Sequence, residues 1–126
     1  MSRTRLANIL VVDDEPLNRL LLATVLRPLG HDVLEAADGE AGLKAVIDRA
    51  PDLVVVDLAM PGMGGVRFLK ALRRELCSDV PVVLYTATRP DAAMRDLADL
   101  FAISGILEKP SEPAEIERVV SAALGG

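Results

Sequence analysis

Short apolar runs alternate with segments of helical periodicity along this chain. The apolar runs end in polar or turn residues, which is typical of strands buried in a parallel sheet. They predict strands over residues 9–12, 33–36, 53–56, 80–85 and 106–108. Helices are predicted between and after them, over residues 16–29, 39–50, 66–76, 90–102 and 112–124. Five strand–helix repeats predict an α/β fold in which helices wrap both faces of a parallel sheet.

Capping and turn residues support several of these boundaries. Pro16 suits the first turn of a helix and Gly30 suits its end. Asp38 and Ser111 are expected to cap the second and the last helix. The buried face of the first helix is expected to hold Leu17, Leu21, Val25 and Leu29. That of the second helix is expected to hold Leu43, Val46, Ile47 and Ala50.

Two groups of polar residues are interpreted as ordinary surface and turn residues. Arg73, Arg74 and Glu75 are consecutive in the third predicted helix, which indicates a solvated helix face. His31 is the only histidine and lies in a predicted turn, so no chemistry is assigned to it. No cluster of cysteine and histidine residues suits zinc.

Length and composition restrict the class of protein. With 126 residues, 51% of them hydrophobic, the chain can bury one core, and residues 1–126 are predicted to form a single domain. A formal net charge of −5 argues against a nucleic-acid-binding surface. No apolar stretch is long enough to cross a membrane, and Asp13 interrupts the first apolar run too early for a secretory signal. We therefore expect a cytoplasmic domain, in which the single cysteine, Cys77, is a free thiol.

Acidic residues follow two of the predicted strands. Asp13 and Asp14 come directly after the first apolar run, and Asp57 comes directly after the third. Because the carboxyl ends of parallel strands share one edge of the sheet, these carboxylates are expected to converge there. Clustered carboxylates repel one another unless a cation joins them, and Mg²⁺ is the hard divalent ion that such oxygen ligands favour. The sequence thus predicts a magnesium site with one carboxylate available for chemistry.

The chain resembles the receiver domain of bacterial two-component response regulators, over nearly its whole length. Each matching motif is weak alone, but all of them occur in order and each lies at the end of a predicted strand. The motifs are Val11-Val12-Asp13-Asp14-Glu15-Pro16, Asp57 with Met60-Pro61-Gly62, Thr86-Ala87, and Lys109-Pro110. The resemblance implies a flavodoxin-like (βα)5 fold, a doubly wound five-stranded parallel sheet with strand order 2-1-3-4-5.

The resemblance also implies a function and a set of site residues. A histidine kinase or a histidine phosphotransfer protein would donate a phosphoryl group to Asp57, which acts as the nucleophile. Lys109 would pair with Asp57 and then with a phosphoryl oxygen, and Thr86 would bind another phosphoryl oxygen. The Lys109-Pro110 peptide bond is expected to be cis. The ligands implied for Mg²⁺ are Asp13, Asp14, Asp57 and the main-chain carbonyl of Ala59.

The implied output is a change in the face formed by the fourth helix, the fifth strand and the fifth helix. This change would control a downstream protein or a fused output domain, with the chain acting alone or as the receiver part of a larger protein. The domain would catalyse only its own phosphorylation and dephosphorylation. The cognate kinase, the target, the pathway and homodimerisation are left open by the sequence, and no contact with nucleic acid or membrane is expected through this domain.

Two other functions are weighed against this one. A Mg²⁺-dependent phosphohydrolase of the haloacid-dehalogenase type also uses an aspartate nucleophile, but it needs a second acid two residues later. Ala59 occupies that position. A flavin carrier with the same fold needs a phosphate-binding loop after the first strand, where Asp14 and Glu15 would repel the phosphate.

Two positions depart from what the resemblance leads one to expect. Ile106 stands where many receivers have Tyr or Phe, so an aromatic side chain at this place cannot report activation. Ala59 and Thr88 occupy the two positions that flank the path of the hydrolytic water in receivers. Because Ala59 has no side-chain polar atom, we hypothesise a longer-lived phosphoryl group than in a receiver with polar residues at both positions.

Overall fold

The computed structural model describes residues 6–60, 62–87 and 89–125, and in them the predicted α/β fold is confirmed. Five parallel strands form one sheet in the order β2-β1-β3-β4-β5. The strands are β1 (Asn8–Val12), β2 (Asp32–Ala36), β3 (Leu53–Val56), β4 (Val82–Thr86) and β5 (Gly105–Glu108). The helices are α1 (Pro16–Leu26), α2 (Gly39–Arg49), α3 (Gly65–Lys70), α4 (Ala92–Leu100) and α5 (Pro113–Ala123). A 3₁₀ turn (Arg27–Leu29) follows α1, and a π-helical turn (Ala71–Glu75) follows α3.

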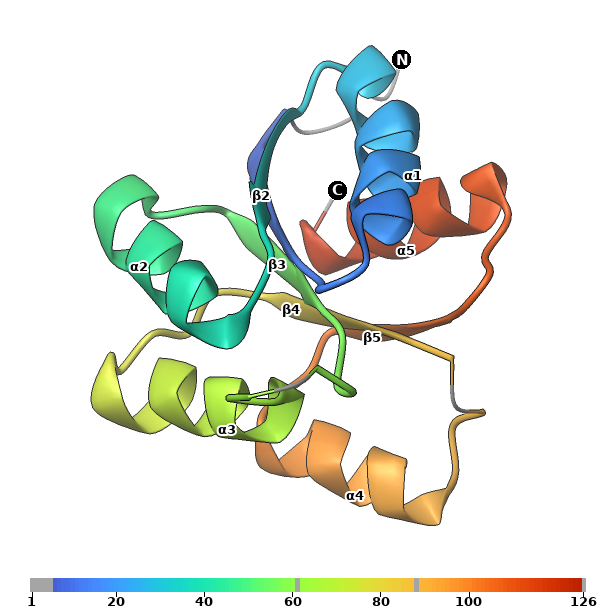
Figure 1. Ribbon diagram of the computed structural model, residues 1–126. Helices are drawn as coiled ribbons and strands as arrows, with labels where there is room; N and C mark the ends of the chain where they lie inside the picture. The colour runs from blue at the N-terminus through green and yellow to red at the C-terminus, as the bar shows by residue number, and fades with distance from the viewer. Residues whose placement is uncertain (1–5, 61, 88, 126) are drawn as a thin grey trace.

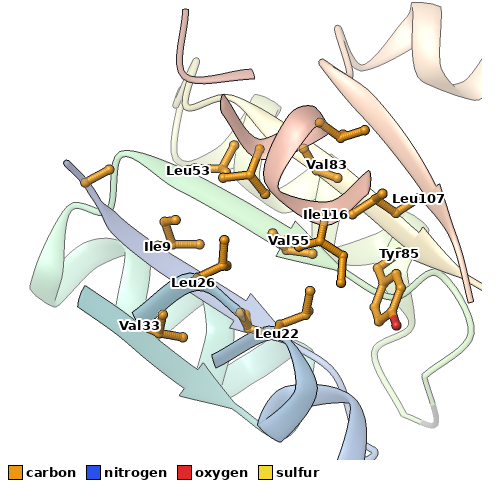
Figure 2. Packing of buried hydrophobic residues seen from close by; sticks show 14 of the residues in the cluster. Ile9, Leu22, Leu26, Val33, Leu53, Val55, Val83, Tyr85, Leu107 and Ile116 are labelled. Atoms are coloured by element: carbon orange, nitrogen blue, oxygen red, sulfur yellow. The ribbon is translucent and has the colours of Figure 1, made fainter. Parts of the chain in front are cut away.

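The helices form two layers, one on each face of the sheet. Figure 1 shows α1 and α5 on one face and α2, α3 and α4 on the other. Alternate strand residues point to opposite faces, and both faces are buried, which explains the continuous apolar runs. On the α1/α5 side, Ile9, Val55 and Tyr85 belong to one buried cluster (Figure 2). Leu10 and Val54 belong to the cluster on the opposite side.

The strand register carries the polar residues to a common edge. Val12 of β1 pairs with Val56 of β3, so the next residues, Asp13 and Asp57, leave the sheet side by side. On the other flank of β3, Thr86 of β4 pairs with Glu108 of β5, directly before Lys109. This edge is where ligands bind in open α/β sheets.

The buried faces predicted for the first two helices are wrong in part. Leu17 of α1 is 75% exposed, whereas Leu22 and Leu26 have no exposed surface. In α2, Ile47 is 65% exposed. Leucines occur on several sides of α1, so periodicity fits more than one face, and packing against the sheet selects among them.

Gly42 determines which face of α2 turns inward. A Cβ at this position would lie 2.9 Å from side-chain atoms of both Phe68 and Val12. The absence of a side chain therefore lets the helix lie close to α3 and β1. A hydrophobic pattern does not reveal this face, because its central residue is glycine.

The helix caps agree with the sequence in one case and disagree in another. Asp38 caps α2, as predicted, by accepting a hydrogen bond from the Ala41 N–H at 2.8 Å. The prediction that Ser111 caps the last helix is wrong, because α5 begins at Pro113. The Ser111 hydroxyl instead donates to the carbonyl of Glu108, at 2.5 Å. Proline at the first helical position removes an N–H that would otherwise need a capping acceptor.

Arg73 corrects the interpretation of residues 73–75 as a solvated helix face. Its guanidinium donates to the carbonyls of Phe101 at 2.9 Å, Ser78 at 3.1 Å and Val80 at 2.6 Å. These carbonyls lie at the end of α4 and in the connection that leads to β4. Arg73 thus joins the π-helical turn after α3 to the C-terminal end of α4.

We expect Arg73→Met to lower the free energy of unfolding by about 2–3 kcal/mol, because it leaves several carbonyls without their charged donor. Arg73→Lys should recover only part of the loss, since one ammonium cannot replace a planar fork of donors. Arg74→Met is the matched control, because Arg74 is exposed. Urea unfolding measures all three, and equal losses at both positions would contradict the role given to Arg73.

His31 is buried and neutral in the fold. Its Nδ1 accepts a hydrogen bond from the Ala7 N–H at 3.1 Å, so its proton lies on Nε2, which is buried and has no hydrogen-bond partner among the described residues. Burial lowers the pKa of His31 below its ordinary value of 6.5. From the connection that leads into β2, the histidine thus anchors the chain just before β1.

Stability is expected to fall as the pH drops below about 6.5, because the unfolded chain then binds a proton at His31 that the folded chain resists. The contribution is complete above pH 6.5 and is lost toward the lowered pKa of the folded state. In His31→Gln, the slope of stability against pH should be shallower in this window. Identical slopes in both proteins, measured by urea unfolding, would refute the assignment.

Candidate functional site at the carboxyl edge of the sheet

Three aspartates converge at the carboxyl ends of β1 and β3. Carboxylate oxygens of Asp13, Asp14 and Asp57 lie within 4.8 Å of one another. Asp13 is 1% exposed and Asp57 is 5% exposed, while Asp14 is half-buried. Carboxylates so close together and so little hydrated repel each other strongly, and the site needs positive charge to hold them.

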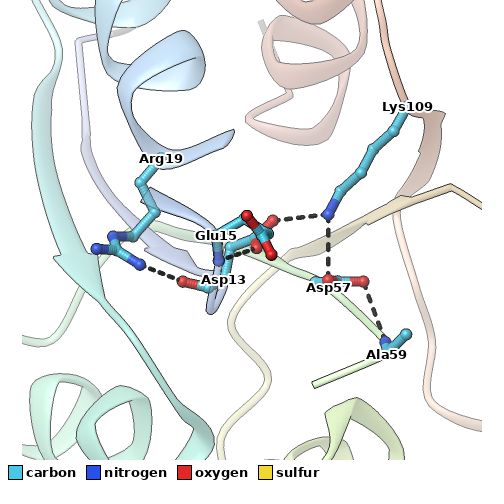
Figure 3. A network of polar contacts seen from close by, with 6 residues as sticks. All are labelled: Asp13, Glu15, Arg19, Asp57, Ala59 and Lys109. Atoms are coloured by element: carbon cyan, nitrogen blue, oxygen red, sulfur yellow. Dashed lines mark hydrogen bonds and ion pairs between the residues drawn. The ribbon is translucent and has the colours of Figure 1, made fainter. Parts of the chain in front are cut away.

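Lys109 supplies one positive charge to this cluster. Its ammonium donates to Asp13 Oδ2 at 2.9 Å and to Asp57 Oδ2 at 3.1 Å (Figure 3). Burial would lower the pKa of Lys109, but its hydrogen bonds and ion pairs with the two carboxylates prevail and raise the pKa above its ordinary value. The lysine therefore remains charged at neutral pH. Its peptide bond to Pro110 is cis, as the sequence resemblance implied.

Main-chain groups orient the two buried carboxylates. The Glu15 N–H donates to Asp13 Oδ1 at 2.9 Å, and the Ala59 N–H donates to Asp57 Oδ1 at 3.0 Å. Arg19 donates to the main-chain carbonyl of Asp13 at 2.6 Å, and Figure 3 shows it on the side of Asp13 away from Lys109. Each carboxylate thus has one oxygen held by a main-chain N–H and the other held by Lys109.

Two of these supporting residues were not identified from the sequence. Arg19 reaches Asp13 from α1, and its Nε also pairs with Glu35 of β2 at 3.3 Å. No local pattern signals this contact, because it depends on how α1 lies over the sheet. The Glu15 N–H donates to the side chain of Asp13, two residues before it. The only sequence signal for this hydrogen bond was an aspartate placed just before a turn.

Gly65 allows the loop after Asp57 to fold tightly against α3. A Cβ at Gly65 would lie 2.5 Å from Leu58 Cα and 2.6 Å from the carbonyl oxygen of Asp57. The Gly65 N–H donates to the Leu58 carbonyl at 3.0 Å. Any side chain at this position would displace the backbone of Asp57. The third helix was predicted to begin after this residue, at position 66, so no sequence signal indicated this role of Gly65.

Of the remaining candidate residues, Thr86 lies at the same edge of the sheet. Thr86 is buried at the end of β4, and its carbonyl accepts a hydrogen bond from the Lys109 N–H at 2.7 Å. Ile106 is partly buried against the cluster on the α2/α3/α4 side, so that position carries an aliphatic group. Thr88, the second position expected to flank the water path, lies outside the described residues.

The three aspartates fit a hard divalent cation. They offer carboxylate oxygens only, and these oxygens are close enough to share one ion. Lys109 binds one oxygen each of Asp13 and Asp57, so oxygens remain for a metal. Ala59 contacts Asp57 through its N–H, and the role of its carbonyl as a ligand stays a prediction.

No helix within the described residues has the length and apolar character needed to cross a membrane.

Comparisons with known proteins agree with this architecture. The family model of the response regulator receiver domain matches residues 9–121. The DNA-binding response regulator MtrA of Mycolicibacterium smegmatis is 39% identical over 92% of this chain and 50% of its own length. A probable chemotaxis protein CheY of Rhizobium etli is 30% identical over 99% of this chain and 98% of its own length.

A solved structure gives the same result for the fold. The chemotaxis protein CheY4 of Vibrio cholerae aligns with a TM-score of 0.87 and 26% identity, over 94% of this chain and 99% of its own. The first curated relatives are longer, and the chain spans about half of their length. With a matching family model, a shared fold and converging acidic residues, this chain belongs to the response regulator receiver domains, a family of signalling domains.

Proposed function

We propose that this domain is a phosphorylation-dependent switch that accepts a phosphoryl group on Asp57 in the presence of Mg²⁺. The donor is a histidine kinase or a histidine phosphotransfer protein in the cytoplasm. The observation that carries the proposal is the position of Lys109, whose ammonium bridges Asp13 and Asp57 while Asp14 stands beside them. A charged lysine, an oriented carboxylate and a set of oxygen ligands are what phosphoryl transfer to an aspartate requires.

The proposed transfer uses few groups. A carboxylate oxygen of Asp57 attacks the phosphorus, and the bond from phosphorus to the donor nitrogen breaks as the acyl phosphate forms. Asp13, Asp14, Asp57 and the main-chain carbonyl of Ala59 would hold Mg²⁺, which would supply positive charge to neutralise the phosphoryl oxygens.

Lys109 and Thr86 act on the phosphoryl group in this proposal. Lys109 shifts from the Asp57 carboxylate to a phosphoryl oxygen, and its raised pKa keeps it charged for that purpose. The hydroxyl of Thr86 binds another phosphoryl oxygen and so links phosphorylation to β4 and the loop that follows it.

Intact mass after incubation with acetyl phosphate tests this proposal. We expect the mass of one phosphoryl group to appear with Mg²⁺ and to be absent when the metal is chelated. Because small donors depend on the receiver's own groups, uptake would show that the domain itself catalyses the transfer. Failure to label folded protein with either acetyl phosphate or a phosphorylated histidine phosphotransfer domain would contradict the proposal.

The second candidate function, an aspartate-based phosphohydrolase, receives little support from the site. Its second acid would have to stand at Ala59, whose side chain is a methyl group beside the Asp57 carboxylate. Turnover of a phosphomonoester such as p-nitrophenyl phosphate distinguishes the two functions. A switch should release no more than a stoichiometric amount of product on the time scale of its own labelling.

The output of the switch is proposed to lie on the α4, β5 and α5 face. Because relatives such as the DNA-binding response regulator MtrA are about twice as long as this chain, a fused output domain is one form of this output, and a separate downstream protein is the other. Because residue 106 is isoleucine, no aromatic side chain at this position can change orientation on activation. The change on this face must therefore occur through the packing of its helices. A homodimer formed through the same face is compatible with either form.

Phosphorylated Asp57 is expected to lose its phosphoryl group about threefold to tenfold faster in Ala59→Asn, because an amide can hydrogen-bond and orient the attacking water. The Ala59 N–H already lies 3.0 Å from Asp57 Oδ1, so a longer side chain at position 59 starts beside the acyl phosphate. The decay of the phosphorylated mass after removal of the donor measures the rate. Ala59→Val is the control for side-chain size, and equal lifetimes in Ala59→Asn and the unchanged protein would contradict the hypothesis.

A further inference from the structure

Tyr85 lies next to Lys109 because of the pairing of β4 with β5. Tyr85 is opposite Leu107, and Lys109 is two residues further along the same face of the chain. Tyr85 is 1% exposed and belongs to the cluster beneath α1 and α5, where Figure 2 shows its hydroxyl at the edge of the cluster.

The ring and the hydroxyl of Tyr85 have separate contacts. The Lys109 ammonium lies 5.1 Å from the centre of the ring, within the range of a cation–π interaction. The hydroxyl lies near the main chain of Ser111, just beyond the cis peptide bond. Burial raises the pKa of Tyr85 and the charge of Lys109 opposes that rise, so the phenol is neutral at physiological pH.

The Lys109 ammonium therefore has a different partner on each side. The carboxylates of Asp13 and Asp57 accept its hydrogen bonds, while the Tyr85 ring lies within cation–π range. A lysine has several rotatable bonds and a strongly hydrated head, and in the absence of a second contact it tends to extend toward water. An aliphatic residue at position 85 would fill the core but would offer no attraction to the cation.

We propose that Tyr85 is a positioning residue whose ring holds the Lys109 ammonium at Asp57. The importance of this for phosphoryl transfer rests on the function proposed above. The position of the lysine does not depend on that function and can be measured separately. On this proposal, one strand serves the site twice, with Thr86 at its edge and Tyr85 beneath Lys109.

Tyr85→Phe, Tyr85→Leu and Tyr85→Met separate the ring from the volume that it fills. We expect labelling by acetyl phosphate at saturating Mg²⁺ to be about threefold to tenfold slower in Tyr85→Leu and Tyr85→Met, because the cation–π contact is lost. Tyr85→Phe retains the ring and should retain most of the rate. Phe68→Leu is the matched control, because it removes a buried aromatic residue from the opposite cluster.

The ε-methylene protons of Lys109 provide a second measurement that a merely structural role would not change. In the unchanged protein and in Tyr85→Phe, the ring should shift these NMR signals upfield of those of Lys44 and Lys70, the other lysines of the chain. The shift should disappear in Tyr85→Leu and persist in Phe68→Leu. Unfolding curves establish that each variant is folded under the conditions of the measurement.

The outcomes separate this proposal from the proposed function. Slower labelling together with a lost upfield shift in Tyr85→Leu supports it. Equal labelling rates in Tyr85→Phe and Tyr85→Leu, or no upfield shift in the unchanged protein, would overturn it. If the unchanged protein takes up no phosphoryl group, the proposed function fails, and the Lys109 signals still decide whether Tyr85 holds the lysine.

Discussion

Lys109→Met is expected to slow phosphorylation of Asp57 by about 100-fold, since loss of one preorganised charge at a developing anion costs this much. The side chain of Lys109 is 13% exposed, and it contacts the side chains of Asp13 and Asp57, which are 2% and 7% exposed. Removing the ammonium leaves Asp13 and Asp57 buried without their shared cation. We therefore also expect metal-free protein to lose about 3 kcal/mol of stability, as when a buried ion pair is broken.

The affinity for Mg²⁺ should rise in Lys109→Met, although the labelling rate and the metal-free stability fall. Without the lysine charge nearby, the three aspartates attract a divalent ion more strongly, so Lys109→Met should bind Mg²⁺ more tightly and regain stability when it is added. Lys44→Met, in an exposed position of α2, is the control. The labelling rate comes from intact mass, stability from urea unfolding and affinity from calorimetry. An unchanged labelling rate, or weaker Mg²⁺ binding, would show that Lys109 does not act as described.

Asp57→Asn is expected to take up no phosphoryl group from acetyl phosphate, because the amide is not a nucleophile for phosphorus. It should also weaken Mg²⁺ binding by about tenfold or more, since one of the clustered carboxylates is lost. Metal-free Asp57→Asn should nevertheless be at least as stable as the unchanged protein. The substitution removes one repelling charge and leaves Lys109 paired with Asp13.

Asp48→Asn, an exposed aspartate of α2, is the matched control for Asp57→Asn. It should label normally and bind Mg²⁺ with unchanged affinity. Intact mass and calorimetry on the two variants give the comparison. Stoichiometric labelling of Asp57→Asn would place the acceptor elsewhere, and equal Mg²⁺ affinity in both variants would remove Asp57 from the metal site.

Features that depend on strand ends could be predicted from the sequence. Apolar runs identified the strands, and four of the five runs stop at a residue of the site, so the convergence of Asp13 and Asp57 follows from parallel pairing. The proximity of Tyr85 to Lys109 could not be predicted in this way, because it depends on the register between β4 and β5, which the sequence does not specify. Chemistry at the ends of regular elements is therefore accessible before a structure is known.

Features that depend on how helices lie over the sheet could not be predicted. From the sequence alone, Arg19 and Arg73 would both be taken for exposed surface residues. In the structure, Arg19 donates to the carbonyl of Asp13, outside its own helix, and Arg73 donates to the carbonyl of Phe101, far along the chain. Leu17 and Ile47 matched a helical period but face solvent. Packing geometry decides these cases, and residue type carries little information about it.

The position of the phosphoryl group on the chain is the most direct test of the account. Protein labelled with acetyl phosphate and Mg²⁺ is treated with hydroxylamine, which converts an acyl phosphate to a hydroxamate, and is then digested and sequenced by mass spectrometry. The account predicts a hydroxamate at Asp57 and none at Asp13 or Asp14. A hydroxamate at either of those residues, or phosphate that resists hydroxylamine on a serine or threonine, would contradict it.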